Sequence, residues 1–279
     1  MARKKVLITV TTYPLPSRSY DELVCTAGIL ENGDWIRIYP VPLSFLIDLK
    51  GSGKVNNVKY TWIELDLNRR TDDFRPESHS PANYNFKDIV IGSTVGTEGN
   101  WSRRKELCFK KVYTNKNQLL EDSKAPNNIS LATFKPSKIS GLRIEEDKRD
   151  WKAEWLQLRN QGDLFETVKS IETIIPKLPY KFYYSFLDDS GIESNLMIED
   201  WEIGALYWNC LRTAGGDEMQ ALKKVKEQYE ENFIRNKDIY LFLGTTKEWH
   251  RRRADNPFVI IGVFYPKIDL QKCLFLVFP

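Results

Sequence analysis

Residues 23–39, near the N-terminus, read LVCTAGILENGDWIRIY and carry the clearest fold signal of the chain. Its two ends, residues 23–30 and 35–39, are rich in the β-branched and aromatic side chains that favour strands. Between these ends, Asn32 and Gly33 form one of the strongest short signals for a tight hairpin turn. The two ends are therefore expected to pair as antiparallel neighbours in a sheet.

Two more strand-like runs flank this hairpin, at residues 5–13 and 60–67. No helical segment long enough for a parallel crossover separates the four runs. Short strands divided by turns at such intervals favour a small barrel over a doubly wound sheet. We expect a β-dominated α+β protein whose N-terminal part is an OB-like small β-barrel.

The rest of the chain combines strands with a helical hairpin. Strands are expected at residues 107–113, 139–144, 180–186, 239–244, 258–264 and 273–278, and a short helix at 118–122. On both sides of Gly215 and Gly216, apolar residues recur at helical spacing, which predicts two helices inserted between strands. Residues 68–102 are polar and rich in turn formers, so they are expected to form a long loop.

The length of 279 residues suits two domains. We place their boundary near residue 150, between an OB-like domain of residues 1–150 and a β-unit with the helical hairpin of residues 151–279. Lys and Arg number 41 against 38 Asp and Glu, and the resulting net charge of +3 is too small for a protein that coats nucleic acid non-specifically. Any contact with nucleic acid must come from local patches.

The chain has two histidines, His79 and His250, and four widely spaced cysteines, Cys25, Cys108, Cys210 and Cys273. None of these spacings is that of a zinc site, so the sequence predicts reduced thiols, no metal site and no cofactor. No run approaches the roughly 18 apolar residues that a membrane span requires. We expect a cytoplasmic protein that does not contact a membrane.

A second informative stretch is residues 244–257, which read GTTKEWHRRRADNP between two apolar runs. Its core is Trp249, His250, Arg251, Arg252 and Arg253, and it is expected to form a basic hairpin tip. Arginine binds phosphates and the indole ring stacks on bases, so this pattern favours a nucleic-acid contact. The alternative is a solvated tip whose arginines pair with acidic neighbours.

Strand alternation places Trp35, Arg37 and Tyr39 on one face of the strand at residues 35–39. On an exposed face they would form a platform that stacks on bases and offers a charge to phosphates. The alternative is a structural cation–π ladder that covers the barrel.

Weaker candidates combine basic side chains with aromatic or polar neighbours. They are Arg18 in the loop at residues 13–22, Arg75 beside Glu77 and His79, and Trp101, Arg103 and Arg104 in the run at 101–105. His79 is of interest because an unperturbed imidazole titrates near neutrality.

Two other classes of function stay open. The carboxylates Asp48, Glu64 and Asp66 and the triplet at 150–152 would serve a Mg²⁺-dependent nuclease or a nucleotide-modifying enzyme. The chain lacks phosphate-loop and dinucleotide glycine motifs, and it has almost no material for a catalytic triad. The aromatic residues Trp151 and Trp155 and the helix at 201–211 would instead serve a protein-interaction scaffold.

Residues 24–29 and 32–41 resemble the opening hairpin of the bacterial dual OB-containing domains, which are associated with mobile elements and anti-phage systems. The segment at 75–78 (RPES) and the helix start at 200–202 (DWE) are similar to those of an uncharacterised bacterial family. A zinc-binding cluster of that family is not carried over, because residues 187–191 read LDDSG here. The resemblance implies OB-like barrels and nucleic-acid association, and it implies no particular activity.

The sequence thus predicts an accessory protein of a bacterial defence or DNA-processing system that binds DNA or RNA and contacts other proteins of that system. Arg37 and the three arginines at 251–253 are expected to contact phosphates. Trp35, Tyr39 and Trp249 are expected to stack on bases. No catalytic residue is assigned.

Overall fold

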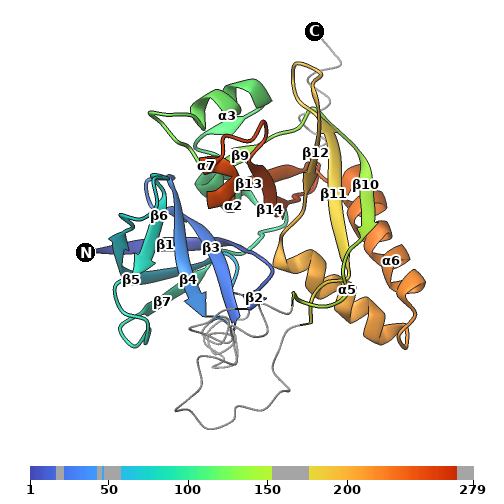
Figure 1. Cartoon of the computed structure of the whole chain (residues 1–279), viewed down its shortest axis with the longest axis horizontal. Helices are drawn as coiled ribbons and strands as arrows, with labels where there is room; N and C mark the ends of the chain where they lie inside the picture. The colour runs from blue at the N-terminus through green and yellow to red at the C-terminus, as the bar shows by residue number, and fades with distance from the viewer. Residues whose placement is uncertain (17–21, 43–45, 47–57, 153–175, 269–279) are drawn as a thin grey trace. The chain divides into compact units, whose positions relative to one another are not determined.

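A computed structural model describes residues 1–16, 22–42, 46, 58–152 and 176–268 (Figure 1). Two compact units can be distinguished. The first comprises Met1–Thr94 with Ile144–Phe182, and the second comprises Val95–Arg143 with Tyr183–Pro279.

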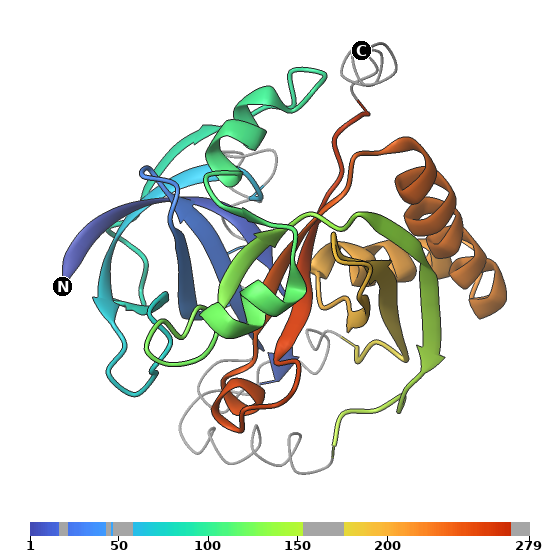
Figure 2. The ribbon, with the colours of Figure 1, turned by 90° about the horizontal axis from the view of Figure 1, so that it is seen from above.

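The strands of the first unit form a closed barrel. They are β1 (Ala2–Thr11), β2 (Leu15–Pro16), β3 (Glu22–Leu30), β4 (Trp35–Pro42), β5 (Thr61–Arg69), β6 (Ser78–Pro81) and β7 (Val90–Thr94). The ring runs β1-β3-β4-β6-β5 and closes because β5 also pairs with β1, while β2 and β7 extend it at β3 and β5. The β4–β6 pair is parallel and the other pairs of the ring are antiparallel. This five-stranded mixed barrel confirms the expected β-dominated, OB-like fold, and its strands can be followed by their blue to cyan colours in Figure 2.

The hairpin between β3 and β4 forms as its sequence predicts. Gly33 has a φ of 82°, in the left-handed region that a tight turn needs, and its amide donates to the carbonyl of Leu30 at 2.8 Å. On β5 the side chains alternate, with Ile63, Leu65 and Leu67 buried and the residues between them half-buried. This period of two places the apolar set inside the barrel.

Residues 68–102 are not one long loop, because they contain β6 and β7. Strand β6 reads SHSP and has no apolar run, yet it lies between β4 and β5 and closes the barrel. Its pairing relies on backbone hydrogen bonds, which the side-chain pattern does not reveal. The strand expected at 107–113 is also wrong, since residues Ser102–Cys108 form helix α2 and only Val112–Tyr113 form a strand, β8.

The second unit contains most of the remaining elements. In chain order they are α2, β8, α3 (Lys116–Asp122), β9 (Leu131–Phe134), β10 (Lys138–Glu146), β11 (Tyr180–Leu187), β12 (Glu193–Met197), α5 (Trp201–Thr213), α6 (Glu218–Lys226), the π-helix η2 (Glu227–Ile234), β13 (Tyr240–Thr245), α7 (Lys247–Arg251) and β14 (Phe258–Phe264). They form a sheet of order β14-β13-β9-β8 and a sheet of order β10-β11-β12. This division differs from the boundary expected near residue 150, because β9 precedes that point and pairs with β13, which follows it.

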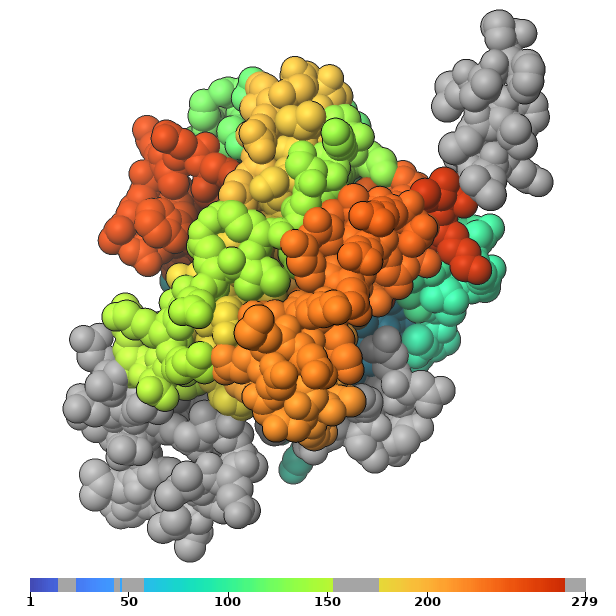
Figure 3. Space-filling model, turned by 90° about the vertical axis from the view of Figure 1, so that its right-hand side faces the viewer, coloured from blue at the N-terminus to red at the C-terminus, as the bar shows by residue number. Residues whose placement is uncertain are grey.

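The helical hairpin consists of α5, α6 and η2 and lies between β12 and β13, as expected. Its surface is shown in orange in Figure 3. Asp200 caps α5 by accepting a hydrogen bond from the amide of Glu202 at 3.2 Å. The buried hydroxyl of Tyr184 on β11 donates to the carbonyl of Tyr229 in η2 at 2.7 Å, which ties the hairpin to the sheet β10-β11-β12. The strand expected at 273–278 lies outside the described residues.

Three of the four cysteines lie in the described residues, and Cys25, Cys108 and Cys210 form no disulfide there. Within the ranges that the structure describes, no helix combines the length and the apolar character that crossing a membrane demands.

Candidate nucleic-acid interface

The strand β4 does not present the expected exposed ladder. Arg37 is only 4% exposed, and Trp35 is half-buried, while Tyr39 is 38% exposed. The guanidinium of Arg37 donates to Ser78 Oγ at 3.4 Å, and burial lowers its pKa. Arg37 is therefore a structural residue of the barrel, and the phosphate contact expected of it does not fit its position. The segment that precedes β6 lies close to Arg37 at this point, because the Arg37 amide donates to the carbonyl of Glu77 at 2.9 Å and the charges of Asp73 and Arg75 act on the guanidinium.

That segment, the β5–β6 loop of residues 70–77, brings a different arginine to Tyr39. The guanidinium carbon of Arg70 lies 5.5 Å from the centroid of the Tyr39 ring, and Nη1 of Arg70 donates to the Tyr39 carbonyl at 3.3 Å. Phe74, on the same loop, is 40% exposed. We call Tyr39, Arg70 and Phe74 the barrel surface. It combines two exposed rings with one guanidinium.

The charge of Arg70 is neutralised locally. Its Nε and Nη2 donate to the two carboxylate oxygens of Asp72 at 3.0 and 2.5 Å, a bidentate pair. The hydrogen bond to Asp72 raises the pKa of Arg70. The barrel surface therefore offers a positioned guanidinium plane with little net charge.

A buried ion pair organises the same loop. Asp73 and Arg75 are both buried, and the Asp73 carboxylate accepts from Nε of Arg75 at 2.9 Å and from Nη2 at 2.6 Å. Burial alone would raise the pKa of the Asp73 carboxyl, but the hydrogen bonds and charge of Arg75 outweigh it and hold that pKa well below its usual range. Like Arg37, Arg75 is thus structural, and the binding role expected of it does not fit its burial.

The cluster of Glu77 and His79 does not resemble an acid–base pair. Glu77 is buried, and Nδ1 of His79 is hydrogen-bonded to the backbone carbonyl of Glu77 at 2.8 Å. Burial lowers the pKa of His79, although the bond to Glu77 opposes this shift. The contact of this imidazole is therefore to the backbone of the loop and not to a carboxylate.

The basic stretch of the second unit lies where the sequence places it, between the paired strands β13 and β14. Its first part is the one-turn helix α7, capped by Thr246, whose hydroxyl accepts from the amide of Trp249 at 3.3 Å. We call residues 246–254 the basic turn. Trp249 is 53% exposed, and Arg251, Arg252 and Arg253 are all exposed.

His250 faces inward and anchors the basic turn. It is buried, and Nε2 donates to the carbonyl of Ser123 at 2.6 Å, since a carbonyl oxygen can only accept. The other ring nitrogen, Nδ1, is hydrogen-bonded to the hydroxyl of Thr245 at 3.0 Å. The direct contact with nucleic acid expected of His250 does not fit this burial.

The end of α7 has a specific backbone geometry. The amide of Ala254 donates to the carbonyl of Trp249 and the amide of Arg253 donates to that of His250, both at 3.1 Å, which is the pattern of a Schellman motif. Arg253 occupies the left-handed position of this motif with a φ of 52°. Glycine is usual there, because a side chain in this conformation costs about 1–2 kcal/mol.

Only part of the charge of the basic turn is paired. Arg252 Nη2 lies 2.7 Å from Oε1 of Glu248. Within the described part of the chain, the side chains of Arg251 and Arg253 form no ion pair or hydrogen bond. The basic turn therefore presents net positive charge beside an exposed indole.

The remaining predicted residues are mostly engaged elsewhere. Trp101 precedes α2 and packs its ring against Phe264 and Tyr265, with centroids 4.9 and 5.0 Å apart. Arg104 is buried, lies 4.9 Å above the Trp101 ring and donates to the carbonyl of Val95. Arg103 is exposed and pairs with Glu106 at 2.5 Å. Arg18 lies outside the described residues.

The carboxylates considered for metal chemistry do not converge. Glu64 and Asp66 point outward from β5, and Asp66 pairs with Arg3 at 3.4 Å. In the ranges that the structure describes, no group of three or more His, Cys, Asp or Glu side chains could hold a metal ion. Asp48 lies outside those ranges. The enzyme hypothesis stays a prediction for which the described residues offer no assembled centre.

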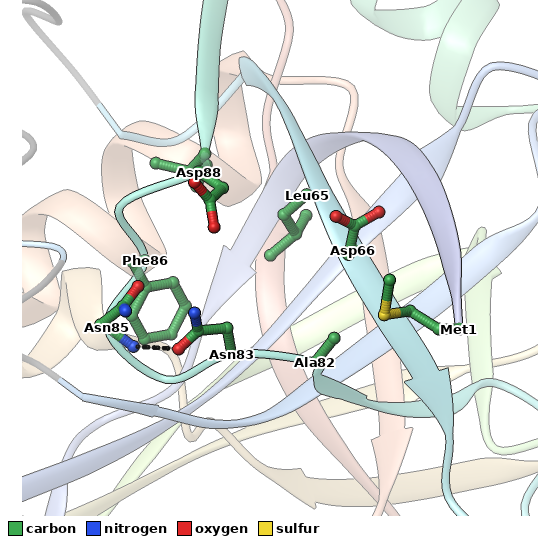
Figure 4. A pocket seen from close by; sticks show the side chains of 9 residues that line it. Met1, Leu65, Asp66, Ala82, Asn83, Asn85, Phe86 and Asp88 are labelled. Atoms are coloured by element: carbon green, nitrogen blue, oxygen red, sulfur yellow. Dashed lines mark hydrogen bonds between the residues drawn. The ribbon is translucent and has the colours of Figure 1, made fainter.

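A hollow of about 240 Å³ lies beside β5 in the first unit (Figure 4). Its labelled lining includes Asp66 and Asp88 and the amides Asn83 and Asn85. The backbone amide of Asn85 donates to the side-chain oxygen Oδ1 of Asn83 at 3.1 Å, so these polar groups belong to a local turn. Two carboxylates repel a phosphate, and we therefore do not count this hollow as part of a nucleic-acid interface.

The fold and these surfaces define a β-barrel protein with two separate groups of exposed rings and arginines. Residues 2–110 match the model of a domain of unknown function, DUF8758, and residues 112–279 match that of a second one, DUF8757. Because the second match covers more than half of the chain, the protein belongs to the DUF8757 family.

No curated protein matches the chain. Among solved structures, a murine DNA-binding protein bound with double-stranded DNA is similar over 96% of this chain and 97% of that one, with 10% sequence identity and a TM-score of 0.31. A similarity with so low a TM-score carries no argument about this chain.

The structure adds two residues that the sequence did not single out, Arg70 and Phe74. Phe74 lies in a polar stretch of the sequence, in which it is the one aromatic residue between Trp62 and Tyr84. That isolation was the available signal. Arg70 had none, because its contact with Tyr39 arises only when β6 brings the loop back to β4.

Proposed function

We propose that the protein binds nucleic acid and that the barrel surface is its contact for unpaired bases. The observation that carries this proposal is the exposure of Tyr39 beside the guanidinium of Arg70. An exposed ring next to a planar cation is the arrangement on which bases stack in proteins that bind single strands.

The position of this surface on the barrel supports the proposal. Tyr39 lies on the third strand of the ring in chain order, and Arg70 and Phe74 lie on the connection between the fourth and fifth strands. In OB-type barrels, oligonucleotides bind across the second and third strands and the loops beside them, including the connection between strands four and five. The barrel here places two exposed rings in that region.

The charge of the barrel surface indicates which form of nucleic acid, single-stranded or double-stranded, it prefers. Arg70 is neutralised by Asp72, so affinity must come mainly from stacking, which contributes about 1–3 kcal/mol per base. Stacking on a side chain requires a base that is not enclosed in a duplex. The barrel surface is therefore expected to prefer single-stranded over double-stranded nucleic acid.

Binding of the full chain to fluorescein-labelled single strands of DNA and RNA, about 15 nucleotides long, tests the proposal by anisotropy. Tyr39→Ala and Phe74→Ala are each expected to weaken binding by roughly 5- to 150-fold, which corresponds to the loss of one stacked base. Tyr84→Ala is the matched control, because Tyr84 is an aromatic residue of the same unit with 41% exposure. Equal affinities of Tyr39→Ala and Tyr84→Ala would remove the barrel surface from the binding site.

The narrower role implied by the sequence resemblance, that of an accessory component of a bacterial defence or DNA-processing system, stays a prediction. Its test is the identification of proteins that co-purify with the chain from its host.

A further inference from the structure

The basic turn does not belong to the barrel surface, yet it carries exposed charge in a fixed geometry. Two observations show that the geometry is fixed. His250 is hydrogen-bonded at both ring nitrogens, and the Thr246 cap and the Schellman motif close the two ends of α7. The arginines therefore leave the surface from a rigid backbone and do not hang from a mobile loop.

A comparison within the chain shows that Arg253 is unfavourable for the fold. Helix α5 ends in the same motif, with the amide of Gly216 donating to Leu211 and that of Gly215 donating to Arg212. There the left-handed position is Gly215, with a φ of 63°, whereas in α7 it is Arg253, with a φ of 52°. The same backbone thus carries glycine at one site and a long cationic side chain at the other.

The side chain of Arg253 also forms no interaction that would offset this strain. Neither it nor Arg251 forms an ion pair or side-chain hydrogen bond within the described residues. A strained residue without internal partners is explained when its side chain acts on something outside the fold.

We propose that the basic turn is a second nucleic-acid contact, which binds the sugar–phosphate backbone through Arg251 and Arg253. For the class of ligand, this inference rests on the proposed function. The two guanidiniums are exposed to solvent, so a single phosphate would gain little from them. A polyanion gains more, because each neutralised phosphate releases condensed counterions.

This contact differs from the barrel surface in what it recognises. Phosphates are present in single strands and duplexes alike and carry no sequence information. The exposed ring of Trp249 lies on the same turn and offers an apolar face to the sugar or to a terminal base. The basic turn is therefore expected to add affinity for both forms of nucleic acid, and this affinity should fall as salt rises.

The decisive variant is Arg253→Gly, which places in α7 the residue that α5 already has. Relief of the left-handed strain is expected to raise the midpoint of thermal unfolding by about 2–4 °C. The same change is expected to weaken binding to the labelled single strand and to its duplex. A substitution that stabilises the protein and weakens binding cannot act through loss of fold.

Salt dependence measures the number of phosphates contacted. In Arg251→Ala/Arg253→Gly, the slope of log affinity against log salt for the single strand is expected to decrease in magnitude by about 1.4, or about 0.7 for each contact. The matched control is Lys223→Ala/Lys224→Ala, which removes the same charge from exposed positions of α6 in the same unit. An unchanged slope, or an equal decrease in the control, would overturn the inference.

The failure of this inference can be told apart from failure of the proposed function. If only the Tyr39→Ala and Phe74→Ala variants lose affinity, the barrel surface binds and the basic turn does not. If only the arginine variants lose affinity, the basic turn binds and the barrel surface does not. If the unmodified chain binds neither DNA nor RNA at low salt, both proposals are overturned.

Discussion

The barrel surface and the basic turn contain the same two kinds of side chain, an aromatic ring and arginine, but they use charge in opposite ways. On the barrel surface Arg70 lies over the ring of Tyr39 and is paired with Asp72. On the basic turn Arg251 and Arg253 are unpaired within the described residues, and Arg252 alone pairs, with Glu248. The number of arginines is thus a poor guide to the electrostatics of a surface, and their partners are a better one.

This difference gives the two surfaces distinct signatures. A neutralised arginine positions a stacking base without adding net charge, so binding there should depend weakly on salt. Unpaired arginines attract phosphates and should make binding strongly salt-dependent. Changes that alter the support or the pairing of each surface therefore test whether the comparison holds.

The largest effect is expected from Asp73→Ala, which removes one partner of the buried pair beneath the barrel surface. Arg75 would be left as a buried charge without its carboxylate, and losses of about 3–5 kcal/mol in the free energy of unfolding are typical of such changes. Denaturant unfolding of the full chain measures this loss. Asp72→Ala is its control, because Asp72 is an exposed neighbour in the same loop and its loss should cost about 1 kcal/mol or less. Similar losses of unfolding free energy in Asp73→Ala and Asp72→Ala would show that the buried pair stabilises the fold no more than an exposed ion pair does.

The same pair predicts the direction of a pH effect. Because the pKa of Asp73 is lowered in the folded state, its contribution to stability is full above the unfolded-state pKa of about 3.9 and is lost as the pH falls towards the folded-state value. The stability of the unmodified chain should therefore decline below about pH 4. In Asp73→Asn this part of the decline should be missing.

A smaller effect is expected from His250→Phe, which retains the ring but removes both of its hydrogen bonds. The buried oxygens of Ser123 and Thr245 would lose a partner, with an expected cost of about 1–3 kcal/mol. Because His250 holds the basic turn, the salt dependence of binding should also decrease. His79→Phe is the matched control, since His79 belongs to the barrel unit and should leave the salt dependence unchanged. Equal slopes in the two variants would show that the basic turn needs no internal anchor.

The sequence allowed prediction of those features that depend on neighbours along the chain. The Asn32-Gly33 turn identified the hairpin of β3 and β4, and the apolar runs around it identified β1 and β5. The position of the basic turn followed from the two apolar runs that flank it, which became β13 and β14. The helical hairpin followed from its period and from the two glycines that separate its helices.

Features that depend on distant partners were not predictable. Strand β6 is short and polar and is defined by the backbones of β4 and β5 on either side. The buried His250 is hydrogen-bonded to a carbonyl 127 residues earlier in the chain, and the sequence around His250 does not indicate that contact. Arg37 was expected to be exposed because alternation separates two faces of a strand, but it does not tell which face another segment covers.

The smallest effects, on the salt dependence of binding, are expected when the carboxylate partner of an arginine is neutralised. Asp72→Asn removes the neutralising charge beside Arg70, so the barrel surface should begin to resemble the basic turn. The slope of log affinity against log salt for a single strand should steepen by up to about 0.7, the value of one additional phosphate contact. Glu248→Gln exposes the charge of Arg252 in the same way and is the matched change on the basic turn.

If the slope steepens only in Glu248→Gln, Arg70 does not face the phosphates, and the barrel surface recognises bases by stacking alone. If it steepens equally in both, the two surfaces differ only in their pairing, and a single carboxylate determines how each one responds to salt.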